Sequence, residues 1–191
     1  SREALSDILP AGGARNAVDC AMWDLKAKQS GRSVAALAGL TQTRPLVTTY
    51  TIFADTPEVM AERARSYSSA KALKLKLTRE PELDIQRVRA VRPEPPDAYI
   101  GVDANQGYDR IDLVALLPEL VDAGVALIEQ PVARGRESDL ENLHSPIPIA
   151  ADESVLDVDD VAALVGRFDV VNIKLDKCGG LTEGLRMATE A

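Results

Sequence analysis

The chain alternates between short apolar segments and amphipathic segments, and this alternation limits the folds that it can adopt. Six segments are rich in apolar and β-branched residues, which is typical of buried strands. They span residues 46–54, 72–78, 98–106, 126–132, 147–154 and 169–177. Each is followed by a segment with helical periodicity or by a short helix or loop. Because strands that alternate with helices pair in parallel, the sequence predicts a parallel α/β sheet.

Ionisable residues recur at one end of the predicted strands. Lys76, Asp103, Glu129, Asp152 and Lys174 each lie towards the carboxyl end of a different apolar segment. A doubly wound open sheet is the first expectation for such a chain, but no glycine-rich phosphate loop follows the first segment. In an α/β barrel the carboxyl ends of the strands are where active sites are built. The pattern therefore favours a TIM-like (β/α) barrel.

Three of these residues are acids on successive strands. Asp103, Glu129 and Asp152 would converge if the strands are parallel neighbours. Three close carboxylates cannot all stay ionised without a cation, and oxygen ligands suit a hard ion such as Mg²⁺. The alternative interpretation is that each acid caps a loop or pairs with an arginine.

Two lysines share one strand with an alternating pattern. Leu73, Leu75 and Leu77 lie on one face of the segment at 72–78, and Lys74 and Lys76 lie on the other. On an isolated strand both lysines would point to solvent. Between two amphipathic helices they are instead expected to face the site, where nearby positive charge favours the neutral amine that can act as a general base. Lys174 would supply a second amine from the sixth strand, on the other side of the acids.

Composition excludes several classes of function. The net charge of −8 argues against nucleic acid and against an anionic membrane surface as partners. Only Cys20 and Cys178 are cysteines, which fits a reducing, cytoplasmic setting better than a disulfide framework. The single histidine, His144, makes a histidine-based zinc site or a Ser-His-Asp triad a poor fit. No apolar run is long enough to span a bilayer.

The order of these motifs resembles the enolase superfamily, and within it the muconate-lactonizing-enzyme subgroup. The matching features are the K-x-K of Lys74 and Lys76, "DAN" at Asp103, "EQP" at Glu129, "ADES" at Asp152 and "NIKLDKCGG" around Lys174. The stretches "TTYTI" and "NIKLDKCGGLTE" are most similar to dipeptide epimerases that act on L-Ala-D/L-Glu.

The resemblance implies roles for the residues that match. The three acids would bind Mg²⁺, which would hold a substrate carboxylate and stabilise an enediolate intermediate. Lys76 and Lys174 would be the acid/base catalysts on opposite faces of the α-carbon, while Lys74 and Thr51 would contact the substrate. Strand alternation places Lys174 and Asp176 on one face and Lys177 on the other, and the family pattern selects Lys174. The implied reaction is epimerisation of a dipeptide, by a homo-oligomer that binds a small carboxylate.

The resemblance also divides the chain into two parts. Residues 1–45 are expected to be a helical lead-in from the capping-domain region, and residues 46–191 a partial barrel of about six βα units. Family members have a capping domain and seventh and eighth strands besides, and a barrel takes about 250 residues. We therefore expect the chain to be part of a longer protein or to complete itself by association.

Three other interpretations of the chain stay open. A muconate cycloisomerase or o-succinylbenzoate synthase-type reaction would use the same metal and lysines on a different acid. A Schiff-base barrel would use one lysine as a nucleophile, but it would leave the three aligned acids unexplained. The chain could also be an inactive folded piece or an assembly partner.

Overall fold

The computed structural model describes residues 2–191, with the backbone alone for Glu3, and it forms two compact units. The first, which we call the sheet unit, comprises Val47–Ser154 and Val165–Val170. The second, the helical unit, comprises the residues up to Leu46 together with Val155–Leu164 and Val171–Ala191.

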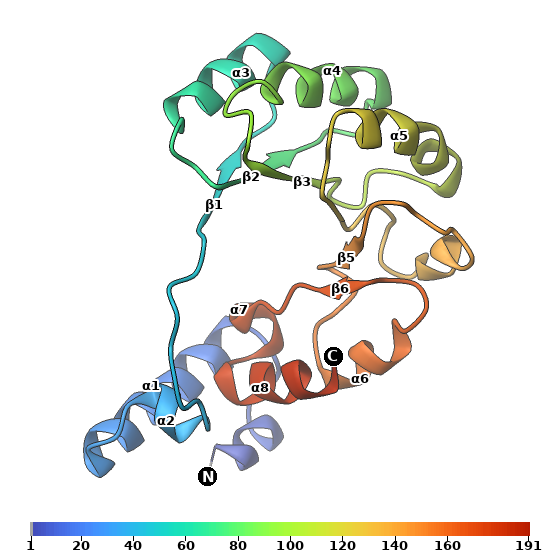
Figure 1. The fold of residues 1–191 in the computed structure, drawn as a ribbon. Helices are drawn as coiled ribbons and strands as arrows, with labels where there is room; N and C mark the ends of the chain where they lie inside the picture. Colours follow the sequence, from blue (N-terminus) through green and yellow to red (C-terminus); the bar gives the residue numbers. More distant parts are fainter. Residues whose placement is uncertain (1) are drawn as a thin grey trace. The chain divides into compact units, whose positions relative to one another are not determined.

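Six strands form one sheet in chain order (Figure 1). They are β1 (Thr49–Ile52), β2 (Ala72–Lys76), β3 (Tyr99–Asp103), β4 (Leu127–Glu129), β5 (Ile149–Ala151) and β6 (Val170–Val171). The pairs from β1 to β5 are all parallel. The predicted parallel α/β architecture is therefore confirmed.

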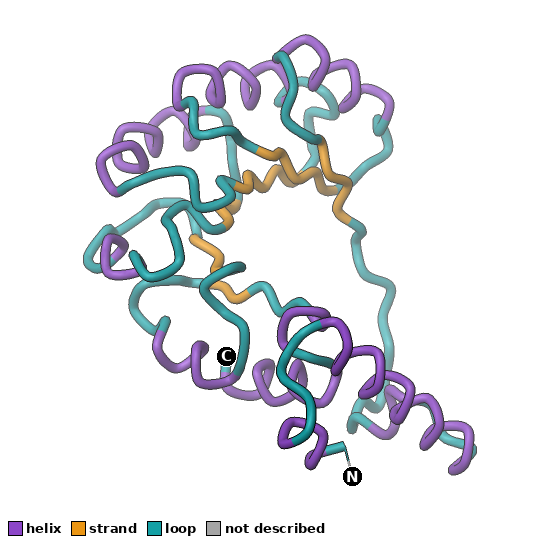
Figure 2. Tube along the Cα trace, turned by 180° about the vertical axis from the view of Figure 1, so that it is seen from behind, coloured by secondary structure: helices purple, strands orange, loops and turns teal. Residues whose placement is uncertain are grey.

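The alternation of side chains along the strands separates a packed face from a polar face. Leu73, Leu75, Ile100, Val102 and Ile128 are buried in the hydrophobic core of the sheet unit. Three helices run along that side of the first strands, as Figure 2 shows from behind. These helices are α3 (Pro57–Ser66), α4 (Pro81–Val91) and α5 (Arg110–Asp122). Because successive side chains of a strand point to opposite faces, the residues between these apolar ones face away from the helices.

The helices of the sheet unit begin where the sequence indicates. Thr56 caps α3, its hydroxyl accepting a hydrogen bond from the Val59 amide, and Pro57 takes the first helical position. Asp109 caps α5 in the same way. Helix α5 continues through Pro118. A short 3₁₀ helix, η2 (Glu137–Leu140), follows β4.

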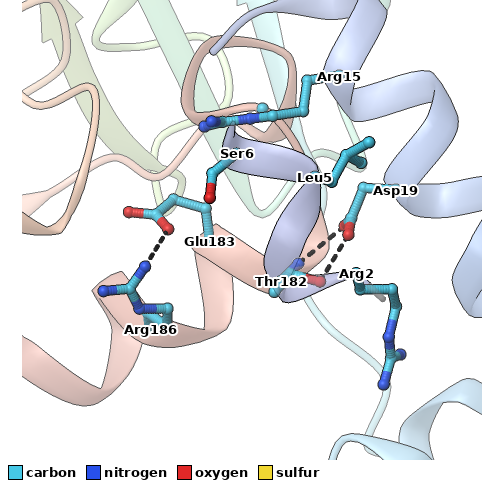
Figure 3. A pocket seen from close by; sticks show the side chains of 9 residues that line it. Arg2, Leu5, Ser6, Arg15, Asp19, Thr182, Glu183 and Arg186 are labelled. Carbon is cyan, nitrogen blue, oxygen red and sulfur yellow. Dashed lines mark hydrogen bonds and ion pairs between the residues drawn. The ribbon is translucent and has the colours of Figure 1, made fainter. Parts of the chain in front are cut away.

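The helical unit is held together by polar contacts between distant parts of the chain. It contains η1 (Glu3–Asp7), α1 (Gly13–Ser30), α2 (Val34–Leu37), α6 (Val158–Ala163), α7 (Leu175–Cys178) and α8 (Leu181–Glu190). The buried carboxylate of Asp19 on α1 accepts hydrogen bonds from the Thr182 amide at 2.9 Å and hydroxyl at 2.6 Å (Figure 3). Trp23, also on α1, donates its indole N–H to the same hydroxyl at 2.9 Å. These bonds fasten the start of α8 to α1.

A pocket lies beside this junction, lined by side chains of both charges (Figure 3). Two of its lining arginines have polar partners: Arg186 pairs with Glu183 at 3.0 Å, and the Arg15 guanidinium donates to the Cys178 carbonyl at 2.6 Å. The pocket therefore reflects how α1 packs on the end of the chain.

The prediction for the sixth strand is wrong in its extent. We expected a strand over 169–177, but only Val170–Val171 is extended in the sheet, and Leu175–Cys178 forms one helical turn. The Lys177 and Cys178 amides both donate to the Lys174 carbonyl at 3.0 Å, and Gly179 ends the turn with a φ of 87°. The alternation argument for Lys174, Asp176 and Lys177 is therefore also wrong, because the last two are helical.

Among the described residues, no helix is both long and apolar enough to cross a membrane.

Candidate active site

The register of the sheet brings polar side chains to one level at the carboxyl ends of the strands. Lys76 pairs with Asp103, and Asp103 pairs with Glu129. Each is the last residue of its strand, and Asp152 follows the last residue of β5 directly. Neighbouring parallel strands run side by side, so these residues converge on the face opposite α3, α4 and α5.

Three buried carboxylates form the centre of this cluster. One oxygen each from Asp103, Glu129 and Asp152 lies within 4.8 Å of the others. The three residues are 0%, 4% and 1% exposed. Opposite ligands of an octahedral Mg²⁺ are about 4.2 Å apart, and this ion prefers carboxylate oxygens. The donor set and its spacing therefore fit a hard divalent cation.

Two ammonium groups lie directly against the acids. The Lys74 Nζ is 2.5 Å from Glu129 Oε2 and 3.3 Å from Asp103 Oδ2, and the Lys76 Nζ is 2.6 Å from the same Asp103 oxygen. Both lysine side chains therefore point into the cluster rather than only to solvent. The two ammonium groups thus lie against two of the three acids, Asp103 and Glu129. A carboxylate offers about four lone-pair positions, so it can accept from a lysine and also bind a metal.

The backbone behind the acids is held in an unusual conformation. Asn105, Gln106 and Gln130 have φ values of 46°, 63° and 39°, in the left-handed region that non-glycine residues seldom adopt. The Asn105 amide donates to Asp103 Oδ1 at 3.0 Å. The Gln106 amide donates to the Gln130 carbonyl at 2.8 Å, which joins the loops after β3 and β4. Strained residues of this kind cluster at functional sites, where the surrounding structure imposes them.

Gln130 is a residue of the site that the sequence did not single out. Its fully buried amide oxygen accepts from the Asp152 amide at 2.8 Å and the Ser154 amide at 3.1 Å. Its amide nitrogen donates to the Val132 carbonyl and to the Ser154 hydroxyl. Gln130 therefore follows one acid in the chain and fixes the backbone of another. The only sequence signal is its place in "EQP", which by itself assigns no contact.

The chain of hydrogen bonds continues outward to Glu137. Burial tends to raise the pKa of this carboxyl group, but hydrogen bonds from the Ser154 hydroxyl and the Gly135 amide outweigh it, and the pKa is lowered. Glu137 thus stays ionised as an acceptor and supports the neutral network beneath the acids.

The other two predicted site residues lie in different surroundings. Thr51 pairs with Lys74 in the register of β1 and β2 and is half-buried. Lys174 belongs to the helical unit, where it is the residue directly before α7. The structure thus brings together the three acids and Lys76 and Lys74 within the sheet unit, with Thr51 on the adjacent strand.

Comparison with known families agrees with this arrangement. Residues 59–191 match the Enolase C-terminal domain-like family, which covers most of the chain. The chain belongs to the enolase superfamily. Residues 2–39 of this enolase-superfamily chain also match the N-terminal domain of the mandelate racemase and muconate lactonizing enzymes.

Several relatives of this superfamily chain are named as epimerases or racemases, and another is an o-succinylbenzoate synthase. It is 46% identical over 191 residues to the L-Ala-D/L-Glu epimerase of Escherichia coli (strain K12), covering 100% of this chain and 60% of that protein. It is 43% identical to the N-acetyl-D-glutamate racemase of Pseudoalteromonas sp, covering 98% of this chain and 58% of that protein. A solved structure of the dipeptide epimerase from Enterococcus faecalis V583, complexed with Mg and the dipeptide L-Leu-L-Tyr, has a TM-score of 0.91 and 34% identity, covering 98% of this chain and 55% of that one. The chain thus spans somewhat more than half of each of these relatives.

Proposed function

We propose that the protein carrying this chain is an isomerase that moves a proton at the α-carbon of a small carboxylate, and that its reaction is the epimerisation of a dipeptide such as L-Ala-D/L-Glu. The observation that carries the proposal is a cluster of three buried carboxylates at adjoining strand ends, two of which contact lysine ammonium groups. The likeness to the Escherichia coli epimerase supports the choice of a dipeptide.

The proposed metal ligands are Asp103, Glu129 and Asp152, with Mg²⁺ as the ion. When bound, Mg²⁺ would polarise the substrate carboxylate and offset the negative charge that develops on it. Lys74 would add positive charge beside that carboxylate, because its Nζ already lies against Glu129 and Asp103. Thr51, at the level of Lys74 on β1, would offer a hydroxyl to the substrate.

Lys76 and Lys174 are the proposed bases. One would take the α-proton and the other would return a proton to the opposite face, which inverts the centre. Lys76 is suited to this role because its amine reaches the acids at the end of β2. For Lys174 the support is the family motif around it.

We also propose the division of the chain into a helical lead-in at 1–45 and a partial catalytic barrel at 46–191. Separate family matches at 2–39 and 59–191 support a boundary between them. A reducing, cytoplasmic setting is supported by the free thiols of Cys20 and Cys178. A homo-oligomer stays a prediction, which analytical ultracentrifugation of the protein would test.

The decisive experiment is α-proton exchange in D₂O with a panel of dipeptides and Mg²⁺. The parent protein should exchange and invert the α-centre of its substrate, whereas Lys76→Ala and Lys174→Ala should each stop inversion. Glu129→Gln should weaken Mg²⁺ binding by more than the roughly 10–100-fold that loss of a supporting residue costs. If both lysine variants exchange at the parent rate, the two-base mechanism is wrong.

A second candidate is racemisation of an N-acylated amino acid, which the likeness to the N-acetyl-D-glutamate racemase favours. Both substrates have a carboxylate next to an acylated α-amine, so the same acids and lysines would serve. Adding N-acetyl-glutamate to the panel separates the two, because the true substrate should have the higher kcat/KM.

A further inference from the structure

A buried charged pair on α4 contacts the loop that follows Lys76 and lies outside the site described above. Asp84 is 1% exposed and Arg87 is 6% exposed, and the Arg87 Nη1 is 2.8 Å from Asp84 Oδ1. The two residues are three apart on the helix, so they share a face. Replacing a buried ion pair by apolar residues is often neutral or stabilising, so the pair calls for a reason other than packing.

The Asp84 carboxylate binds the loop that follows β2. It accepts hydrogen bonds from the Thr78 amide at 3.0 and 3.2 Å and from the Glu80 amide at 3.1 Å. Thr78 comes two residues after Lys76, the last residue of the strand. Asp84 therefore fixes the backbone where the chain leaves the proposed base.

Arg87 extends the same network to the first strand. Its Nε donates to the Asp55 carbonyl at 2.7 Å, in the loop that follows β1. Its Nη1 also donates to the Thr78 hydroxyl. The guanidinium thus joins the loops after β1 and β2 through donors in a fixed planar geometry.

Tyr108 connects the loop that follows β3 to the same ion pair. Its hydroxyl donates to Asp84 Oδ2 at 2.6 Å, from the segment that follows β3 and Asp103. Burial, together with the hydrogen bond to Asp84, raises the pKa of Tyr108, so the phenol remains a donor. One ion pair therefore binds the exits of β1, β2 and β3, the strands that carry Thr51, Lys76 and Asp103.

We propose that Asp84 and Arg87 are positioning residues that set the direction of Lys76 towards the α-carbon, an inference that rests on the proposed function. Neither residue touches the substrate; they act through the backbone at Thr78. Displacement of a catalytic group by about 1 Å can cost about 100-fold in rate, so a loop fastened at three points has a direct effect on catalysis.

The two-base mechanism supplies a test that general destabilisation would not mimic. Each epimer presents its α-proton to a different lysine, so Lys76→Ala should abolish exchange for one epimer and spare the other. Asp84→Asn keeps the shape of the side chain, but its amide NH₂ is a donor and cannot accept the hydrogen bonds that the carboxylate accepts. We expect it to lower exchange about 10–100-fold for the Lys76-facing epimer and less than about 3-fold for the other. Gln130→Ala is the matched control, and it should lower both equally, because it disturbs acids that both epimers use.

Lysine reactivity gives a second readout that does not depend on catalysis. In Asp84→Asn, labelling of Lys76 by acetic anhydride should rise at least about threefold relative to the exposed Lys28, because its amine is less firmly held on Asp103. Thr78→Val, which removes the hydroxyl contact without burying a lone charge, should show the same changes to a smaller degree if Asp84→Asn does not fold.

The outcomes separate the two proposals. Unequal loss of exchange with increased Lys76 labelling supports the positioning role. Equal loss for both epimers, or unchanged Lys76 labelling, overturns it. If the parent protein exchanges neither epimer of any substrate in the panel, the proposed function fails, and the labelling result still decides whether Asp84 positions Lys76.

Discussion

The two lysines that we propose as bases are held by different kinds of structure. Lys76 ends a five-residue strand, and its exit loop is bound by Asp84 a few residues further along the chain. Lys174 follows a two-residue strand and precedes a single helical turn. The last carbonyl of that turn is bound by Arg15, which is 163 residues away in sequence.

The loop after Lys76 is bound by a residue near it in the sequence, whereas the turn after Lys174 is bound by a residue far from it. The bonds from Asp84 to the loop after Lys76 form within one strand–loop–helix unit, so little loop-closure entropy opposes them. The turn after Lys174 is fixed by Arg15 on α1, which must come from the other end of the sequence. We therefore expect the loop after Lys76 to resist local unfolding better than the turn after Lys174, and the predictions below test that contrast.

Arg87→Met should have the largest effect on stability. It leaves the Asp84 carboxylate buried without its cation, and loss of one partner of a buried pair costs about 3–5 kcal/mol. Urea denaturation followed by circular dichroism measures the loss. The control is Arg89→Met on the same helix, whose side chain is 54% exposed and should change stability by less than about 0.5 kcal/mol. Similar values for both variants would show that the pair near Lys76 contributes little.

Asp19→Ala should have the next largest effect and should act on the helical unit. It removes a charged acceptor from the Thr182 amide and hydroxyl, which costs about 1.5–3 kcal/mol. Hydrogen exchange should also become faster at the amides of α8. Asp24→Ala, at an exposed ion pair with Lys28 on the same helix, is the control. Unaltered exchange at α8 would contradict the view that α1 holds this end of the chain.

Tyr108→Phe should cost about 1 kcal/mol at neutral pH, through loss of the hydrogen bond to Asp84. The pKa of Tyr108 is raised in the folded state, so its contribution is complete below the unfolded pKa of about 10 and declines at higher pH. The difference in stability between parent and variant should therefore narrow from pH 9 to pH 11. Denaturation curves across this range provide the measurement, with Tyr67→Phe as an exposed control. A constant difference would argue against the buried hydrogen bond.

Cysteine alkylation should show the smallest structural effect of these tests, and it reports on the exposure of the turn after Lys174. Cys178 is 1% exposed, and burial raises the pKa of its thiol, so little thiolate is present at pH 8. Cys20 is half-buried and should react at least about tenfold faster with iodoacetamide. Arg15→Met should speed the reaction of Cys178 and leave that of Cys20 nearly unchanged, as mass spectrometry of the two peptides would report. Equal rates in the parent protein would mean that the turn opens freely.

The parallel sheet and the meeting of the acids could be predicted from sequence because they depend on short-range patterns. Alternation in 72–78 separates Leu73 and Leu75 from Lys74 and Lys76, and the structure has them on opposite faces. The acids at the ends of β3 and β4 and after β5 follow from strand periodicity and parallel order. The roles of Gln130 and Asp84 could not be predicted, because each depends on which loop its side chain reaches.

The sequence by itself determined which residues stand at the ends of the strands, because the two-residue period of a strand sorts polar from apolar side chains wherever one face must be buried. Tertiary structure alone decided where the sixth strand stops and how the chain continues past Lys174. In that stretch, a pattern typical of a strand becomes a helical turn, closed at its C-terminal end by Gly179 in a left-handed conformation, with its last carbonyl bound by Arg15 on α1. The helical turn forms there despite the local preference for a strand. A hydrogen bond to a charged group contributes more free energy than the small difference between strand and helix propensity over a few residues.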